Sequence, residues 1–255
     1  MATATESAVF QQDMTVRYYE QDPQGRLRPC DIFNWFQEIA RLHRKQYKSS
    51  IADIEPRGYT WVVHRARIVV HSMPRVYGDC TVSTWVHHRM DKFSVRECVI
   101  KAPDGRRLLS AATQWVVLSL ADKKPARLSQ VSPGFPVSEE RAIEGDLKPI
   151  YMPPGLKDLG STEVTATPWC MDSNRHVNNS VYVLWMCDSV FPHTEAEGTP
   201  YLRELEVNYR REVKQGQRIT CRCLRAPDGA YYHELVHKDS GETVATLRST
   251  WSSRP

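Results

Sequence analysis

The sequence lacks any long apolar segment. No apolar run approaches the roughly 20 residues that a helix needs to cross a bilayer. The first ten residues, MATATESAVF, have neither the charged-then-apolar order of a secretory signal nor the arginine-rich amphipathic character of a transit peptide. These absences predict a cytoplasmic protein without stable membrane insertion.

Cysteine patterns that hold disulfides or metals are also missing. The seven cysteines, an odd number, are scattered singly apart from Cys221 and Cys223. They include no CxxC pair and no Cys/His spacing typical of a zinc site. We therefore interpret them as free thiols in a reducing compartment, and we predict no metal and no other cofactor.

Several signature motifs of large enzyme classes are absent. The sequence has no phosphate-binding glycine-rich loop, no HExxH and no GxSxG, which excludes nucleotide-binding, zinc metalloprotease and α/β-hydrolase interpretations. A net charge of +4 over 255 residues is too mild to predict nucleic-acid binding. Basic residues gather locally at 41–45 and 122–124. A solvated helix face or loop explains either cluster. The alternative is that the clusters bind an acidic partner.

Proline, in contrast, is abundant in one region. Six of the 16 prolines fall within residues 121–160, among charged residues and without sustained periodicity. A structureless segment of that length inside one compact domain would be unusual. We therefore predict an N-terminal unit over 1–120, a connection over 121–160 and a C-terminal unit over 161–255.

The two predicted units repeat the same landmarks in the same order. An aspartate precedes a tryptophan by thirteen residues in each half, at Asp22 and at Asp172. Further on, Gly78 is paired with Gly216, and the segments APDGRRLLSAATQW and KDSGETVATLRSTW end in a tryptophan at corresponding places. Each half is therefore predicted to consist of a loop, a helix and then several strands.

The periodicity of apolar residues places these elements. The first helix is predicted from Asp31, as its N-cap, to about Gln46, and the second begins near Asn178 or Asn179, either of which can cap it. Alternating or β-branched segments predict strands at 61–70, 80–89, 94–102, 106–120, 201–210, 217–225, 231–238 and 242–251. One helix followed by a curved antiparallel sheet that wraps it predicts an α+β fold in each half.

The stretch DSNRHVNN, residues 172–179, is unusually rich in polar side chains. In the repeat comparison, Asn174 corresponds to Gln24 and His176 to Arg26. The pairing of Gly78 with Gly216 also places Glu212 opposite Pro74 of the first half. The second half thus holds a polar set that the first half has lost apart from its aspartate: Asp172, Asn174, His176 and Glu212.

Each of these residues also has a structural explanation. Asp172 recurs as Asp22 and is equally well explained as a brace for the loop. His176 by itself is typical of a satisfied loop histidine, and Glu212 by itself is typical of a solvated charge at the end of a strand. The adjacent Asn178 is better explained as a helix cap than as a catalyst. Only the set as a whole favours an active site.

The same stretch resembles a motif of the acyl-ACP thioesterases. DSNRHVNNSVYVLW is similar to the family's Asp-x-Asn-x-His-Val-Asn-Asn-x-x-Tyr-x-x-Trp, and LEVNYRREV resembles its strand ending in Tyr-Arg-Arg-Glu-Cys. MPRVYGDCTVSTW and GRRLLSAATQWVVLSL are also similar to family segments, so that the resemblance covers nearly the whole chain from about residue 13.

The resemblance implies a tandem double hotdog fold and release of free fatty acid from acyl carrier protein. It places the acyl-chain pocket largely in the N-terminal hotdog and the catalytic residues in the C-terminal one. The chain starts almost directly on the predicted fold, without the plastid leader of plant members, which favours a bacterial-type cytoplasmic member. The catalytic positions carried over by the resemblance are Asp172, Asn174, His176 and Glu212.

One departure from the family motif bears on the mechanism. Plant members commonly have a cysteine after the motif glutamate, whereas here that position is Val213, which cannot form an acyl-enzyme. We therefore expect Glu212 to act as general base on water. Asn174 would orient the water or the thioester, and His176 would donate to the oxyanion or share the proton. Asp172 would fix the loop or the imidazole, and free N–H groups at the helix start would bind the carbonyl oxygen.

Two other functions remain open on the sequence. An acyl-CoA thioesterase would perform the same reaction on another carrier, and a non-catalytic acyl-binding or dehydratase-like module would share the fold. The predicted partner is acyl carrier protein bearing a fatty acyl chain, with the basic residues at 41–48 and Lys123 and Lys124 as its docking sites. No nucleic-acid partner is predicted, and a homodimer is left open.

Overall fold

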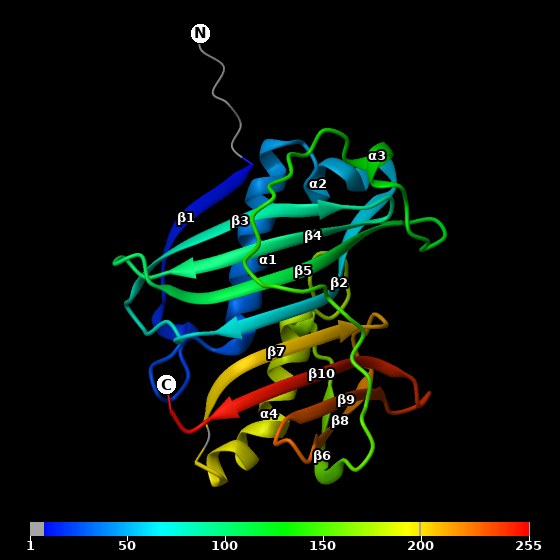
Figure 1. The fold of residues 1–255 in the computed structure, drawn as a ribbon. Helices are drawn as coiled ribbons and strands as arrows, with labels where there is room; N and C mark the ends of the chain where they lie inside the picture. The colour runs from blue at the N-terminus through cyan, green and yellow to red at the C-terminus, as the bar shows by residue number, and fades with distance from the viewer. Residues whose placement is uncertain (1–7, 199, 255) are drawn as a thin grey trace.

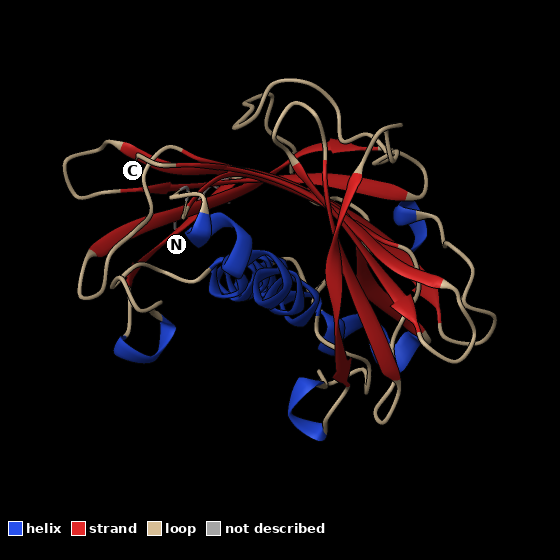
Figure 2. Ribbon diagram, turned by 90° about the horizontal axis from the view of Figure 1, so that it is seen from below, coloured by secondary structure: helices blue, strands red, loops and turns tan. Residues whose placement is uncertain are grey.

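The computed structural model describes residues 8–198 and 200–254. Ten strands of this part form one antiparallel sheet in the order β1-β3-β4-β5-β2-β7-β10-β9-β8-β6. The strands are β1 (Val9–Thr15), β2 (Tyr59–Val70), β3 (Asp79–Arg89), β4 (Phe93–Lys101), β5 (Arg107–Ser119), β6 (Lys157–Thr165), β7 (Tyr201–Tyr209), β8 (Arg218–Arg225), β9 (Tyr231–His237) and β10 (Thr243–Ser252). The sheet curves around two long helices, α1 (Pro29–Gln46) and α4 (Asn179–Ala196), which lie side by side on its concave face (Figures 1 and 2).

Short helical segments complete the described elements. They are α2 (Ile51–Ile54), α3 (Leu128–Val131), and the 3-10 segments η1 (Tyr18–Glu20), η2 (Glu55–Arg57) and η3 (Pro168–Cys170). Within the described residues, no helix is long and apolar enough to cross a membrane.

The halves share one topology. The N-terminal strands run in the order β1-β3-β4-β5-β2, and the C-terminal strands run in the corresponding order β6-β8-β9-β10-β7. The two sets join where β2 pairs with β7, with Arg65 opposite Asn208. The predicted α+β class and double hotdog arrangement are therefore confirmed, with five strands wrapped around one long helix in each half and the two sets joined into one continuous sheet (Figure 1).

The apolar stripe of α1 explains why this helix lies in the concave face. The stripe recurs at helical spacing and is buried, as predicted: Ile32, Phe33, Phe36, Ile39 and Ala40. The predicted N-cap, however, was wrong. The helix begins at Pro29, because a proline is favoured in the first turn, and Asp31 lies inside that turn, where it accepts a hydrogen bond from Arg28 Nε at 2.6 Å.

The start of α4 agrees with the prediction. Asn178 is the N-cap, and its side-chain Oδ1 accepts the N–H of Ser180 at 3.0 Å. This bond satisfies one of the backbone donors that a helix start leaves free. The cap therefore fixes the point at which the polar stretch 172–179 turns into the helix.

The two halves are offset by one residue from the predicted register. Val16 and Ala166 are equivalent, since each lies six residues before its loop aspartate. The N–H of Tyr77 donates to the Val16 carbonyl at 2.9 Å, and the N–H of Gly216 donates to the Ala166 carbonyl at 2.8 Å. Gly216 therefore corresponds to Tyr77 and not to Gly78, and both residues have a positive φ, of 59° and 82°.

This correction changes the residue that lies opposite Glu212. The carbonyls of Pro74 and Val213 each accept, at 2.8 Å, the N–H of the residue that ends the loop of their half. Val213 thus corresponds to Pro74, and Glu212 corresponds to Met73. The predicted pairing with Pro74 was wrong because it aligned two glycines, whereas a tyrosine occupies the left-handed turn position in the first half.

The eight predicted strands are all present, with ends within about two residues of the prediction. The edge strands β1 and β6 were not predicted, and β6 begins inside the predicted connection 121–160. The one-turn helix α3 also lies in that connection. The division of the chain into two units and a connection stays a prediction.

Candidate active site

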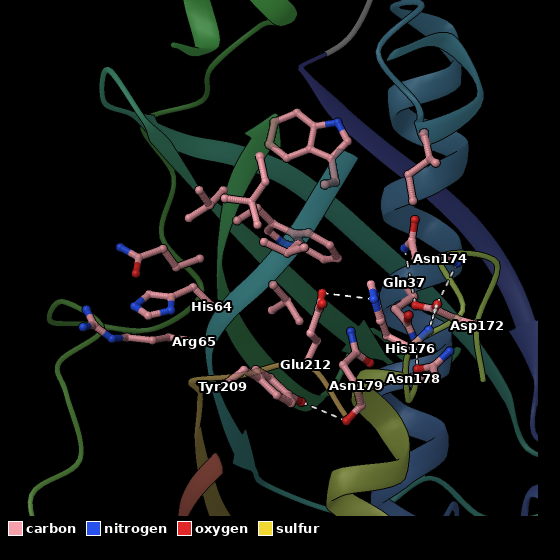
Figure 3. Close-up of a pocket in the computed structure, with 18 of the residues that line it drawn as sticks. Gln37, His64, Arg65, Asp172, Asn174, His176, Asn178, Asn179, Tyr209 and Glu212 are labelled. Carbon is pink, nitrogen blue, oxygen red and sulfur yellow. Dashed lines mark hydrogen bonds and ion pairs between the residues drawn. The ribbon is translucent and has the colours of Figure 1, made fainter. Parts of the chain in front are cut away.

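A cavity of about 1010 Å³ lies where the two halves meet. The N-terminal half contributes one face of α1 and parts of β2 and β5, and the C-terminal half contributes the polar stretch 172–179 and the segment after β7. Figure 3 shows the polar side chains of this stretch on one side of the cavity. All four predicted site residues line this cavity: Asp172, Asn174, His176 and Glu212.

Asp172 braces the loop. Its Oδ1 accepts the N–H of Asn174 at 2.8 Å and that of His176 at 3.4 Å. Asp22 makes the same two backbone bonds in the first half, both at 2.9 Å. Arg175 has a positive φ of 61° at the turn of this loop. The loop geometry is thus common to both halves, and its conservation within the chain explains Asp172 without a chemical role.

His176 and Glu212 are in direct contact. The Nε2 atom of His176 lies 3.0 Å from Oε2 of Glu212, and Figure 3 shows the glutamate reaching across to the imidazole. The two side chains are 23% and 45% exposed, so water reaches both. A carboxylate that contacts an imidazole in an open cavity is a suitable base for a water molecule.

The position after Glu212 faces away from the cavity. Val213 is completely buried and packs in the main core. The seven cysteines all lie in the described residues, and none is among those that line the cavity. Burial also raises the pKa of the Cys30 and Cys221 thiols to about 12, which disfavours their thiolates.

Asn174 connects the loop to the other half of the molecule. Its Oδ1 accepts a hydrogen bond from the Thr60 hydroxyl at 3.1 Å, and its Nδ2 lies 3.5 Å from Oδ2 of Asp172. The side-chain amide is therefore held with its N–H₂ group on the side of the loop carboxylate. Thr60 was not predicted, because nothing in the N-terminal sequence signals a contact 114 residues away.

The start of α4 forms another wall of the site. Asn178 Oδ1 accepts from Gln37 Nε2 at 3.0 Å as well as from its own helix, and the Tyr209 hydroxyl donates to the Asn179 carbonyl at 3.0 Å. Among the described residues, the N–H of Asn179 has no protein acceptor, and its Oδ1 is buried without a partner. Gln37 and Tyr209 were missed; only the position of Tyr209 inside the segment LEVNYRREV could have signalled one of them.

The corresponding place in the first half has different chemistry. Arg26 replaces the histidine, forms an ion pair with Asp22 at 2.7 Å and stacks over the Tyr201 ring at 4.7 Å. Met73 replaces the glutamate. The same loop therefore carries a carboxylate and imidazole pair in one half only.

The basic residues predicted for docking do not all lie on the surface. His43 and Arg44 are buried, with 0% and 5% exposure, which corrects their assignment to a solvated cluster. They face the interior because α1 turns them toward the sheet one turn after its apolar stripe. Arg41 stays at the surface and is paired with Glu38 at 2.6 Å, and Lys45 is exposed.

No metal is needed to describe these contacts. Within the described residues, no group of three or more His, Cys, Asp or Glu side chains is arranged to hold a metal ion. The absence of a cofactor stays a prediction.

Comparisons of the sequence with protein families and with known proteins all lead to the same family. The sequence family of the acyl-ACP thioesterase N-terminal domain matches residues 7–133, and that of the C-terminal domain matches 162–253. A chloroplastic acyl-[acyl-carrier-protein] hydrolase of Cuphea viscosissima is 27% identical over 266 residues, which cover 95% of this chain and 62% of the relative. A palmitoyl-acyl carrier protein thioesterase of Arabidopsis thaliana is 25% identical and is covered to 64%. The chain thus spans less than two thirds of the length of these relatives.

Solved structures agree on the fold. An acyl-ACP thioesterase from Bacteroides thetaiotaomicron superposes with a TM-score of 0.86 at 23% identity, over 98% of this chain and 100% of that one. The 12:0-ACP thioesterase from Umbellularia californica superposes with a TM-score of 0.85 at 18% identity, over 98% and 99% of the two chains. With both halves matched by the domains of one family, the chain belongs to the acyl-ACP thioesterase family.

Proposed function

We propose that the protein hydrolyses the thioester of a fatty acyl-acyl carrier protein and releases the free fatty acid. The observation that carries the proposal is the contact of 3.0 Å between His176 and Glu212 at the wall of a large cavity. The family membership and the names of the relatives, which act on acyl carrier protein substrates, support the same substrate class.

The proposed reaction uses water as the nucleophile. Glu212 takes a proton from water while the water oxygen attacks the thioester carbonyl carbon. The carbon–sulfur bond then breaks, and the carrier leaves as a thiolate, an easy leaving group because thiols have a pKa near 8.5. The proton held by the pair of Glu212 and His176 passes to that thiolate, so that the products are the fatty acid and the carrier thiol.

The developing oxyanion needs hydrogen-bond donors. In our proposal, the N–H of Asn179 serves because it lies at the start of α4, lines the cavity and has no protein acceptor among the described residues. Asn174 orients the water or the thioester through its amide. Asp172 acts on the loop alone, as its repeat partner Asp22 does.

The acyl chain is assigned to the N-terminal side of the cavity. The lining there contains a group of apolar side chains that includes Trp61, Val63, Phe93, Trp115 and Val116. Burial of methylene groups against such side chains stabilises the bound chain by roughly 0.8 kcal/mol each. The catalytic pair lies on the C-terminal side, so that both halves contribute to one site.

A comparison of carriers tests this function. The purified protein is given one acyl group either on acyl carrier protein or on coenzyme A, and both fatty acid and free thiol are quantified. We expect release from both and a kcat/KM at least about tenfold higher for acyl carrier protein, because an acidic carrier gains from a basic rim. Faster release from coenzyme A would favour an acyl-CoA thioesterase, and binding of acyl carrier protein without fatty acid release would favour a non-catalytic module.

The docking site can be tested separately at Lys123 and Lys124. Both lysines are exposed and lie in the turn closed by the backbone bridge between Leu118 and Pro125, two residues that line the cavity. In our proposal this turn is part of the cavity rim. Reversal of both charges with Lys123→Glu and Lys124→Glu is expected to raise KM for acyl carrier protein substrates by about tenfold at low salt. The effect should shrink at high salt because surface charges are screened.

The matched control for this double variant is Lys157→Glu. This change reverses an exposed charge on β6, the edge strand that closes the C-terminal half of the sheet. It is expected to leave KM unchanged. Equal effects of the control and the double variant, or a salt-independent KM for the wild type, would argue against docking at this rim. The cytoplasmic location and the homodimer stay predictions.

A further inference from the structure

A buried cation lies beside the apolar residues on the N-terminal side of the cavity. Arg44 lines the cavity, is only 5% exposed, and lies over two tryptophan rings, with its guanidinium carbon 4.1 Å from the ring centre of Trp61 and 4.4 Å from that of Trp115. Both rings contribute cation–π attraction to the guanidinium. Because Arg44 lines the cavity, its N–H groups can meet a ligand there.

The described residues supply no acceptor for these N–H groups. The guanidinium of Arg44 takes part in none of their hydrogen bonds or ion pairs. The titratable groups that act on it are Arg96 and Cys98, neither of which has a carboxylate. Burial and the repulsion of Arg96 hold the pKa of Arg44 well below its usual range.

The neighbouring interior adds to the positive charge. Arg96 is completely buried and donates from Nη1 to His43 Nδ1 at 3.0 Å and to the Thr84 hydroxyl at 3.1 Å, while its Nε and Nη2 have no partner. Burial and both arginines lower the pKa of His43 to about 3, so that it is neutral and accepts. Glu97, the next residue on β4, points away and accepts from backbone N–H groups near Ala142.

An unpaired buried cation is costly unless an anion meets it. A carboxylate is well matched to a guanidinium edge, because it can accept two parallel N–H bonds. Arg44 lies seven residues beyond Gln37 on α1, which is roughly 10 Å along the helix from the contact of Gln37 with the cap of α4. The cation thus lies roughly two helical turns away from the wall at which the thioester is proposed to bind.

Resting on the proposed function, we propose that the preferred acyl group carries a carboxylate at its far end and that Arg44 binds this carboxylate. The substrate class is then the monothioester of a dicarboxylic acid. Arg44 is the specificity-determining residue, and Trp61 and Trp115 position its side chain.

The test compares monothioesters of dicarboxylic acids with those of monocarboxylic acids of equal length on one carrier. A series of about six to twelve carbons brackets the distance along α1. For the wild type, we expect kcat/KM to be at least about tenfold higher for the carboxylated chain at the best length. Arg44→Met, which keeps an unbranched apolar stem, is expected to reverse this preference.

The control is Lys92→Met, which removes an exposed, cavity-lining cation and should leave the preference intact. A wild-type preference for the plain chain at every length, or an equal loss of preference in Lys92→Met and Arg44→Met, would overturn the proposal.

A binding measurement keeps this test separate from that of the proposed function. Isothermal titration of the wild type with free dicarboxylates and monocarboxylates needs no hydrolysis, and it also applies if Arg44→Met does not fold. Tighter binding of the dicarboxylate supports the role of Arg44 even if no thioester is cleaved. In that case only the proposed hydrolysis is rejected. Equal or weaker binding of the dicarboxylate rejects the role of Arg44 even if hydrolysis is observed.

Discussion

The variant Glu212→Gln is expected to lose about 10² to 10⁴-fold in turnover on an acyl carrier protein thioester. Glutamine has nearly the shape of glutamate and can still contact His176, but its amide cannot accept a proton from water. The loss should appear in kcat, because the base acts in the transition state and not in the bound ground state. Single-turnover rates of fatty acid release, measured with enzyme in excess, report this step directly.

The control for this prediction is Glu242→Gln. Glu242 is a half-exposed glutamate that forms an ion pair with Arg211 at 2.9 Å. Arg211 directly precedes Glu212 in the sequence, but Glu242 itself does not line the cavity. Its replacement removes a nearby negative charge without touching the proposed base, so kcat should change little. A Glu212→Gln enzyme with near-wild-type kcat would show that the proton is taken by another group.

The repeat within the chain made much of the fold predictable. The aspartate landmarks lie in equivalent loops and the tryptophan landmarks in equivalent helices and strands of the two halves, and even a local detail recurs. Trp115 donates to the Thr113 hydroxyl and Trp251 donates to the Ser249 hydroxyl, both at 2.9 Å. Alternating or continuous runs of apolar and β-branched residues were sufficient for the inner strands, because most of their residues are buried or half-buried.

The edge strands were missed for a physical reason. Most residues of β1 and β6 are exposed or half-buried, so polar side chains occur on both faces and no alternation marks them. The predicted glycine pairing failed for a related reason: the conformation of Tyr77 is set by the turn and not by its residue type. Local sequence patterns report burial better than they report backbone geometry.

The candidate site was predictable only in part. The stretch 172–179 could be singled out, because its polar residues differ from their repeat partners, and the structure brings His176 and Glu212 together across 36 positions of sequence. The contributions of the other half could not be predicted. Thr60 and Gln37 reach the site only through the pairing of the halves, and Arg44 has the sequence context of a surface cluster.

The two halves together suggest how one site was specialised. The loop with its aspartate brace is the same in both, so that its backbone bonds serve the fold. What differs is the side chain that each loop presents: Arg26 is neutralised by its own aspartate, whereas His176 is free to contact Glu212. The proposed chemistry therefore depends on two side chains placed on a shared frame.

His176 is the second residue whose loss should be severe. His176→Ala is expected to lower kcat by about 10²-fold or more, because it removes the group that contacts the proposed base and can donate to the oxyanion. The side chain is partly exposed and its backbone N–H bond to Asp172 stays in place, so the free energy of unfolding should change by less than about 1 kcal/mol. Chemical denaturation and single-turnover kinetics on the same preparation separate the two effects.

Two further variants distinguish catalysis from a merely structural role. His176→Gln retains an N–H donor and is expected to recover part of the lost kcat if His176 donates to the oxyanion, but not if it shares the proton of Glu212. Arg175→Gly changes the exposed neighbour to the residue found at Gly25, which suits the positive φ of this position, and should leave kcat close to that of the wild type. If Arg175→Gly were as slow as His176→Ala, the loop conformation and not the imidazole would control the rate.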